Sequence, residues 1–332
     1  MTSAPTSVPR VLITTAFLRA GDAVSRALEE AGYVVEHAPD LDLLAADERA
    51  ALLAEADALI AGTRPLTAEH LAAAGRLRII VRTGVGYDNV DVAAASRLGI
   101  PVCITPGVNR QAVAEYVFAL ALAHSRHIVT NATQLAAGEW RQPTGRELAG
   151  RTLGVIGLGS IGKAVADMAA AFKMKVIAHD PALDRDYAEA NGIESTSLSD
   201  LLVRADVVTL HLFLDDTTRN LIDARALSAM KPDALIINTS RGGIVDEEAL
   251  AQAVRAGAIA GAAIDVFAEE PLPRESPLRS VDGILTTSHI AGATQEARAG
   301  SGALAADIVI STLNGAAPKH VVNPGHARRA AS

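Results

Sequence analysis

Three ionisable residues of this sequence each stand just beyond a short apolar run that has the pattern of a β-strand. Arg241, Glu270 and His289 follow the runs LII, AAI and ILT. Open parallel sheets bind their ligands at the carboxyl ends of the strands, which is where these residues are expected to lie. A guanidinium can hold a carboxylate, an imidazole can transfer a proton, and a carboxylate can stabilise the protonated imidazole. The three together predict a site that binds a carboxylate and moves a proton, although each alone is common as a surface charge or a structural histidine.

A glycine-rich turn supplies a second chemical signal. Gly157, Gly159 and Gly162 form the pattern GxGxxG, which follows the apolar run LGVI and opens a helical pattern. The next apolar run ends on an acid, Asp180. Such glycines permit a tight turn and the close approach of a pyrophosphate, which the free N–H groups of the helix start would hold. The turn therefore predicts a dinucleotide site; the alternative is a structural strand-to-helix turn without a ligand.

Asp180 indicates which dinucleotide the turn binds. A carboxylate at this position accepts hydrogen bonds from ribose hydroxyls and repels a 2′-phosphate. NAD is therefore the predicted cofactor, whereas Arg185, a few residues further on, leaves weak use of NADP open.

The elements that precede this turn alternate between strands and helices. Helical patterns cover 43–56 and 68–74, and another begins after Asp22 and stops at Gly32. Strands separated by helices pair in parallel, because parallel neighbours need a crossover connection. The first hundred residues thus predict a small doubly wound domain. Its expected strands are Val11–Phe17, Tyr33–His37, Ala58–Ala61 and Ile79–Val81.

A second alternation follows a long helical pattern over Val108–Ile128 and a polar, irregular stretch, Gln134–Gly150, which contains Trp140. Six strands match the count of a full dinucleotide-binding sheet. They are expected at Leu153–Ile156, Lys175–Ala178, Val207–Leu210, Ala234–Ile237, Ala262–Ile264 and Ile284–Thr286. A final helix is expected at Thr294–Leu313.

Composition excludes several classes of protein. The 332 residues are 49% hydrophobic and 20% charged, as in ordinary globular proteins, and they carry a net charge of −8. This balance argues against a nucleic-acid partner, which needs clustered Lys and Arg. The single cysteine excludes an internal disulfide, and no Cys/His spacing predicts a metal site. The chain start resembles no signal peptide and no apolar run spans a bilayer, so a cytoplasmic protein without membrane contact is expected.

Several segments resemble the D-isomer-specific 2-hydroxyacid dehydrogenases, which include lactate, glycerate and 3-phosphoglycerate dehydrogenases. The similarity runs from Arg82 to Val322, whereas residues 1–81 match only in their pattern. It rests on Thr83–Asp91, Thr105–Asn109, Ala112–Glu115, Gly157–Gly162, Asn238–Glu247, Asp265–Pro271 and His289–Ala297. It implies an α/β fold of two doubly wound domains. A Rossmann NAD-binding domain, residues 107–294, would be inserted into a smaller flavodoxin-like substrate domain, residues 1–106 and 295–332.

The resemblance also implies a role for each candidate substrate residue. Arg241 would bind the carboxylate and carbonyl oxygen of the substrate, and His289 would act as the acid and base. Glu270, the acid directly before the proline, would hydrogen-bond His289; Glu269 beside it does not match the family position. The amides of Gly84 and Val85, with Asn109, would complete the substrate cradle.

The implied cofactor contacts extend along the second half of the chain. Main-chain groups of Ile161 and Gly162 would contact the phosphates. Thr239 and Ser240 would line the nicotinamide, and Asp265 would bind its carboxamide. Gly292 would close the loop after His289 at the cofactor site. Leu212 would be a further contact. The Phe213–Leu214 pair after it departs from the family's frequent Pro-Leu, which leaves this contact less defined.

The stretch around Trp140 resembles the arm through which family members form homodimers in their cofactor domain; an ordinary long loop is the alternative. Two functions remain open. One is an NAD-dependent dehydrogenase of a small D-2-hydroxy or 2-oxo acid, and the other is an NAD(H)-sensing binding protein of the corepressor kind. The substrate could be phosphoglycerate, glycerate or hydroxypyruvate, or a phosphonate. A phosphorylated acid would need extra cations, for which Arg64, Arg82, Arg110 and Arg141 are candidates.

Overall fold

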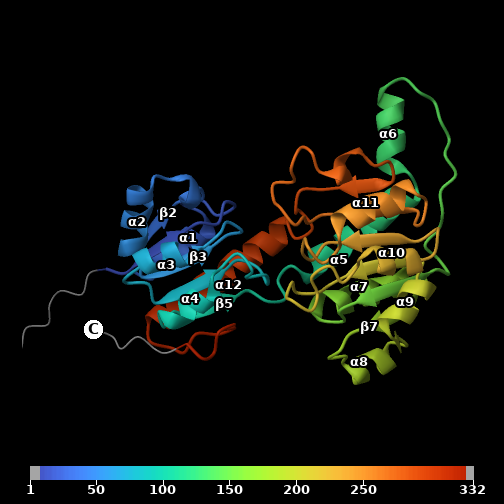
Figure 1. Ribbon diagram of the computed structural model, residues 1–332. Helices are drawn as coiled ribbons and strands as arrows, with labels where there is room; N and C mark the ends of the chain where they lie inside the picture. Colours follow the sequence, from blue (N-terminus) through green and yellow to red (C-terminus); the bar gives the residue numbers. More distant parts are fainter. Residues whose placement is uncertain (1–7, 327–332) are drawn as a thin grey trace, which may run out of the picture. The chain divides into compact units, whose positions relative to one another are not determined.

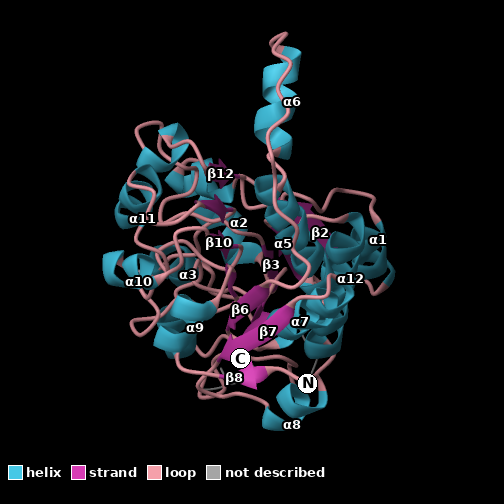
Figure 2. Ribbon diagram, turned by 90° about the vertical axis from the view of Figure 1, so that its right-hand side faces the viewer, coloured by secondary structure: helices cyan, strands magenta, loops and turns pink. Residues whose placement is uncertain are grey.

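The computed structural model describes residues 8–326, which form two compact units. Unit 1 contains the chain up to Asn109 together with the chain from Gln295, and unit 2 is Arg110–Thr294. Strands pair in parallel in both units, with helices on both faces of each sheet (Figures 1 and 2). The predicted α/β class with two doubly wound sheets is confirmed. Residues 1–7 and 327–332, which include the start used to exclude a signal peptide and the outer ends of the expected substrate domain, lie outside the described part.

Unit 1 is built on a five-stranded sheet with the order β2-β1-β3-β4-β5, the flavodoxin-like order. Its strands are β1 (Arg10–Ile13), β2 (Val34–His37), β3 (Ala58–Ala61), β4 (Ile79–Arg82) and β5 (Val102–Ile104). Its helices are α1 (Ala23–Glu30), α2 (Ala46–Glu55), α3 (Ala68–Ala73), α4 (Val92–Arg97) and α12 (Gln295–Leu313), with the 3-10 turn η1 (Leu41–Leu43). Helices α1 and α12 pack on one face, and α2, α3 and α4 on the other.

Two strand predictions for unit 1 are wrong in detail. The first strand ends at Ile13 rather than at Phe17. Thr15 instead turns its hydroxyl to the hydroxyl of Thr83, 3.0 Å away, in the loops beyond the sheet. Strand β5 was absent from the predicted set, because a three-residue strand closely flanked by Pro101 and Pro106 has too little pattern to be recognised.

Unit 2 contains a seven-stranded sheet with the order β12-β11-β10-β9-β6-β7-β8. Its strands are β6 (Thr152–Ile156), β7 (Lys175–His179), β8 (Glu194–Ser195), β9 (Val207–Leu210), β10 (Leu235–Asn238), β11 (Gly261–Ile264) and β12 (Ile284–Thr286). Its helices are α5 (Arg110–Ser125), α6 (Ile128–Ala136), α7 (Ser160–Ala171), α8 (Arg185–Ala190), α9 (Leu198–Arg204), α10 (Ala224–Ala229) and α11 (Glu247–Arg255), with the 3-10 turn η2 (Pro277–Ser280). The chain runs outward from β6 to β8 and then crosses back to β9, which is the Rossmann arrangement.

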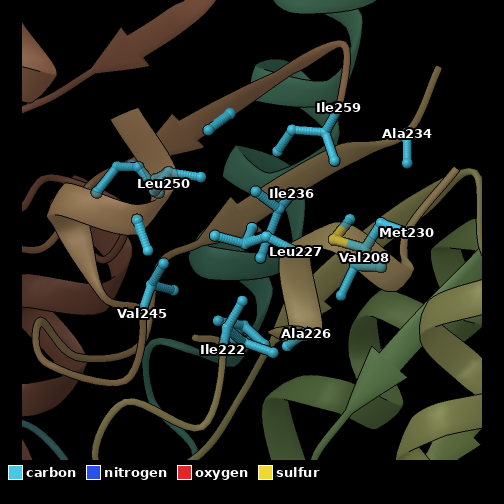
Figure 3. Packing of buried hydrophobic residues seen from close by; sticks show 14 of the residues in the cluster. Val208, Ile222, Ala226, Leu227, Met230, Ala234, Ile236, Val245, Leu250 and Ile259 are labelled. Carbon is cyan, nitrogen blue, oxygen red and sulfur yellow. The ribbon is translucent and has the colours of Figure 1, made fainter. Parts of the chain in front are cut away.

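Aliphatic side chains hold the helices of unit 2 against its sheet. Helices α9, α10 and α11 cover one face, where Leu227, Ile236 and Leu250 are completely buried (Figure 3). Helices α5 and α7 cover the other face. Burial on both sides explains why these strands are continuous apolar runs rather than alternating ones. The strand ends that carry the candidate residues therefore rest on a packed core.

Unit 2 differs from the sequence predictions at two places. The expected helix over Val108–Ile128 is interrupted, because His127 adopts a left-handed conformation (φ 54°) between α5 and α6. Helix α6 then continues to Ala136, into the stretch predicted to be irregular. The sheet also gains β8, whose two exposed residues give no apolar signal.

No helix within residues 8–326 is both long enough and apolar enough to cross a membrane.

Candidate active site

The order of the strands brings the candidate residues of unit 2 to one edge of its sheet. The glycine-rich turn follows β6, an interior strand, and Asp180 follows β7 on one side of it. On the other side, Arg241, Glu270 and His289 follow β10, β11 and β12, which are consecutive neighbours. Because all these strands are parallel, their carboxyl ends form a single edge. A ligand along this edge could reach from Asp180 to His289.

Glu270 and His289 form a direct pair. Glu270 Oε2 lies 2.8 Å from His289 Nδ1, and Glu270 Oε1 accepts a hydrogen bond from Phe267 N (3.0 Å). Burial raises the pKa of Glu270, but the hydrogen bond and charge of His289, the Phe267 N–H and the charge of Arg241 together lower it. Glu270 is thus held as a carboxylate facing the imidazole. The neighbouring Glu269 is exposed.

The loop that carries His289 is fixed by Asp265, which is 0% exposed. His289 has a φ of 55°, an unusual conformation for a residue other than glycine. Its N–H donates to the Asp265 carbonyl oxygen (2.8 Å). The Asp265 carboxylate accepts from Ile290 N (2.9 Å), Ala291 N (2.8 Å) and Thr287 Oγ1 (2.6 Å). The carboxylate that the resemblance relates to the nicotinamide carboxamide is therefore engaged with the His289 loop.

Arg241 lies on a turn that Asn238 stabilises. Asn238, at the end of β10 and 1% exposed, donates from Nδ2 to the Arg241 carbonyl oxygen (2.8 Å). Its Oδ1 accepts from Ser240 N (3.1 Å) and Ser240 Oγ (2.9 Å). Sequence reasoning missed Asn238 as a site residue. The available signal was a polar residue that closes an otherwise apolar strand.

The glycine-rich turn has the geometry of a phosphate cradle. Gly157 has a φ of 92°, and a Cβ at this position would collide with the His211 carbonyl oxygen. A Cβ at Gly162 would collide with the Gly157 carbonyl oxygen. Gly159 is the N-cap residue of α7, and the space beside it is open. Only glycine fits at positions 157 and 162. The open space beside Gly159 leaves the N-terminus of α7 accessible to an anion.

Asp180 is held beside this cradle. Its Oδ2 accepts a hydrogen bond from Leu158 N (2.8 Å) and its Oδ1 from Ala182 N (2.8 Å). Each carboxylate oxygen has two lone pairs, so each can also accept from a ribose hydroxyl.

The remaining cofactor candidates lie along the same edge. Thr239 Oγ1 is buried and has no hydrogen-bond partner within residues 8–326, as expected for a group that meets a ligand. Ile161, Leu212 and Gly292 are half-buried. Phe213, where the sequence departs from the family, is 60% exposed. The orphaned hydroxyl and the glycine cradle fit a nicotinamide dinucleotide.

The other substrate candidates, Gly84, Val85 and Asn109, belong to unit 1. The N–H of Gly84 donates to Thr105 Oγ1 (2.7 Å) and is therefore engaged within unit 1. Asn109 Oδ1 is buried without a hydrogen-bond partner among the described residues.

His211 lies under the glycine-rich turn and gives the fold a pH dependence. Desolvation lowers the pKa of His211 from 6.5 to about 3. Below pH 6.5, His211 of the unfolded chain binds a proton that the folded chain excludes. The contribution of His211 to the free energy of unfolding is therefore complete above pH 6.5 and is lost as the pH falls toward 3. The free energy of unfolding should fall by up to about 1.4 kcal/mol per pH unit through this group.

Urea unfolding of wild type and His211→Gln at neutral and mildly acidic pH measures this effect. Glutamine can bond Thr209 Oγ1, as His211 Nε2 does at 3.0 Å, but it does not titrate. We expect the variant to lose less stability on acidification than wild type. Parallel losses in the two proteins would contradict this account of His211.

Among residues 8–326, no group of three or more His, Cys, Asp or Glu side chains could hold a metal ion.

Comparison with known proteins agrees with this geometry. The model of the D-isomer-specific 2-hydroxyacid dehydrogenase NAD-binding domain matches residues 118–291. A glyoxylate reductase of Aeropyrum pernix is 42% identical over 279 residues, which are 81% of this chain and 83% of that protein. A D-3-phosphoglycerate dehydrogenase of Methanocaldococcus jannaschii is 38% identical over 303 residues, 89% of this chain but only 57% of that protein. The chain therefore spans little more than half the length of that relative.

A solved structure shows the same similarity for the fold. The NADPH-dependent glyoxylate/hydroxypyruvate reductase of Sinorhizobium meliloti, in complex with NADP and malonate, superposes with a TM-score of 0.84 at 29% identity. The alignment covers 98% of this chain and 100% of that one. The predicted family, Rossmann fold and nicotinamide cofactor are thus confirmed. The matching family model and these relatives, together with the sheet edge and the glycine cradle, show that the chain belongs to the D-isomer-specific 2-hydroxyacid dehydrogenase family, a family of nicotinamide-dependent oxidoreductases.

Proposed function

We propose that this chain interconverts a small, unphosphorylated 2-oxo acid and its 2-hydroxy acid, the D isomer where C2 is a stereocentre, with NADH and NAD. The observation that carries the proposal is the Glu270–His289 pair at 2.8 Å beside the Arg241 turn on neighbouring strands. Glyoxylate and hydroxypyruvate are the candidate substrates. Unit 2 would bind the dinucleotide, and the substrate-binding roles of Gly84, Val85 and Asn109 remain predictions. A cytoplasmic location remains a prediction.

In this proposal each residue has one task during reduction. Arg241 binds the substrate carboxylate and polarises the 2-oxo oxygen through its fork of N–H donors. His289 donates a proton to that oxygen, and Glu270 stabilises the imidazolium until it does. The glycine cradle, Asp180 and Thr239 would hold the dinucleotide, which would supply the hydride when bound. In the oxidation direction, His289 takes the proton from the hydroxyl.

The partners of three of the four candidate cations support an unphosphorylated substrate. Arg64 already pairs with Asp40 (2.7 Å) and Asp42 (2.9 Å). Arg141 pairs with Glu139 (2.8 Å). The buried Arg82 donates from Nε to Asn89 Oδ1 (3.1 Å) and from Nη1 to the Thr83 carbonyl oxygen (2.9 Å). A phosphate dianion bound by these three arginines would have to displace their partners, whereas a small oxo acid needs only Arg241. Arg110, the fourth candidate, is exposed at the start of α5.

A panel of 2-oxo acids with NADH and NADPH tests the proposal. We expect the wild-type protein to oxidise NADH with glyoxylate or hydroxypyruvate, more efficiently than with 3-phosphohydroxypyruvate. NADH binding without turnover on any oxo acid would favour the NAD(H)-sensing alternative, which the comparisons do not favour because the relatives are named as enzymes. Preference for the phosphorylated acid would overturn the substrate assignment alone.

The preference for NADH should depend on Asp180. Replacing this carboxylate removes its repulsion of a 2′-phosphate, so Asp180→Ala should lower the ratio of kcat/KM for NADH to that for NADPH by at least about tenfold. Asp186→Ala, which removes an exposed carboxylate of α8, is the matched control and should keep the wild-type ratio. An unchanged ratio in Asp180→Ala would show that another residue selects the cofactor.

We also propose that α6 and the segment around Trp140 form a homodimer interface. No residue of α6 is buried, and three of its apolar residues, Ile128, Val129 and Leu135, are exposed. Figures 1 and 2 both show α6 standing away from the sheet of its own unit. An apolar surface of this kind indicates a partner, and a second copy of the chain is the one that the family resemblance implies.

Sedimentation analysis of two matched variants tests the interface. Leu135 on α6 is 54% exposed and Val203 on α9 is 55% exposed. Burying a charge in an interface is unfavourable, so Leu135→Glu should weaken the dimer by at least about tenfold. Val203→Glu should remain as dimeric as wild type. A monomeric wild type, or equal masses for all three proteins, would contradict the proposed interface.

A further inference from the structure

Glu247, the first residue of α11, reaches across to the loop that carries Glu270. Its Oε1 accepts a hydrogen bond from Ala268 N at 2.7 Å. Glu247 is half-buried on a helix whose Leu250 and Ala251 are completely buried, and Asp246 caps the same helix through Ala249 N (3.0 Å). The Glu247 carboxylate therefore extends from a helix held by buried side chains to the loop that carries Glu270.

The loop connects this hydrogen bond directly to the acid–base pair. Ala268 follows Phe267, whose N–H donates to Glu270 Oε1 (3.0 Å), and Glu270 Oε2 contacts His289 Nδ1 (2.8 Å). Successive N–H groups of one short segment thus bind the side chains of Glu270 and Glu247. Displacement of Ala268 would shift the donor that orients Glu270.

A second contact holds the same segment against the Arg241 turn. A Cβ at Gly242 would collide with the backbone of Phe267 and Ala268. The glycine after Arg241 therefore packs on the same two residues that bind the carboxylates. The start of α11, the Arg241 turn and the Glu270 loop are therefore in mutual contact at Phe267 and Ala268.

We propose that Glu247 is a positioning residue, which holds Ala268 so that Glu270 stays aligned with His289 and Arg241. This inference rests on the proposed function. The charge of Arg241 lowers the pKa of Glu270. On the other side of the His289 loop, Thr287 Oγ1 donates to Asp265 Oδ1 (2.6 Å), and Tyr116 of α5 is close to both residues.

A purely structural role must be distinguished from this one, because an acid in the first turn of a helix also stabilises the helix dipole. Three variants separate the roles. Glu247→Ala removes both the acceptor and the charge, and Glu247→Gln keeps an acceptor oxygen without the charge. Glu248→Ala removes the adjacent, exposed first-turn acid and is the matched control.

The test measures kcat, the KM for NADH and the pH dependence of hydroxypyruvate or glyoxylate reduction. Glu247→Ala should lower kcat about fivefold, with an unchanged KM for NADH. The loss of activity at high pH should begin at a lower pH than in wild type, because a misaligned Glu270 carboxylate interacts less well with His289. Glu247→Gln should restore most of kcat and the wild-type pH profile, and Glu248→Ala should match wild type.

The pH at which activity declines does not depend on the amount of folded protein when circular dichroism shows that each variant stays folded across the pH range of the assay, so reduced stability then does not obscure the result. A wild-type pH profile in Glu247→Ala, or equal defects in Glu247→Ala and Glu247→Gln, would overturn the positioning role. Absence of turnover in the wild-type protein would instead overturn the proposed function.

Discussion

Arg241→Ala is expected to lower kcat/KM for 2-oxo acid reduction by about 10³-fold, close to 4 kcal/mol, while the Kd for NADH stays unchanged. The guanidinium is the cation that the proposal assigns to the substrate carboxylate, and its loss leaves that charge unpaired. The effect should fall on substrate and not on the dinucleotide, since the glycine cradle and Asp180 lie at other strands of the edge. Steady-state kinetics and NADH fluorescence titration measure the two quantities separately.

Two further variants make this prediction specific. Arg241→Lys keeps the charge but loses the planar fork of donors, so it should recover only part of the loss. Arg204→Ala removes an exposed arginine that pairs with Glu194 (2.6 Å) and should behave as wild type. Equal loss of NADH affinity and turnover in Arg241→Ala would place Arg241 in the cofactor site or in the fold instead.

His289→Asn should lower kcat for reduction by about 10³-fold, with little change in NADH affinity, because proton transfer to the oxo group is lost. Asparagine is the suitable replacement, since it tolerates the left-handed conformation that His289 adopts at a φ of 55°. The comparison of kcat with NADH affinity therefore reports on the imidazole rather than on a distorted loop.

The partner of His289 gives a second readout of the same chemistry. Glu270→Gln removes the charge that stabilises the imidazolium, so the activity of this variant should decline at a lower pH than that of wild type. Glu269→Gln, at the exposed neighbouring acid, is the matched control. If Glu270→Gln keeps the wild-type pH profile, or if His289→Asn retains its turnover, the acid–base assignment is wrong.

The fold and the order of the site residues could be predicted because they depend on local pattern. Apolar runs buried on both faces gave the strands of unit 2, and the residues after them gave Arg241, Glu270 and His289. Short or exposed strands were missed, because β5 and β8 have too few apolar residues to form a pattern. The break at His127 was missed because an αL residue other than glycine leaves no local signature.

The residues that support the site could not be predicted from spacing alone. Asn238, Asp265 and Glu247 bind backbone groups of loops, and such contacts depend on how separate loops pack together. The cofactor role that the resemblance implies for Asp265 stays a prediction, and the structure adds that its carboxylate is bound by Thr287, Ile290 and Ala291. Long-range contacts of this kind appear only once the strand order is known.

One measurement addresses the central claim directly: a single turnover with enzyme preloaded with NADH that carries deuterium at both positions of C4, mixed with hydroxypyruvate. We predict stoichiometric appearance of D-glycerate labelled at C2 in the wild-type protein, and transfer slowed by about 10³-fold in Arg241→Ala and in His289→Asn. Unlabelled product, or transfer at the wild-type rate in either variant, would contradict the assignment of the chemistry to this site.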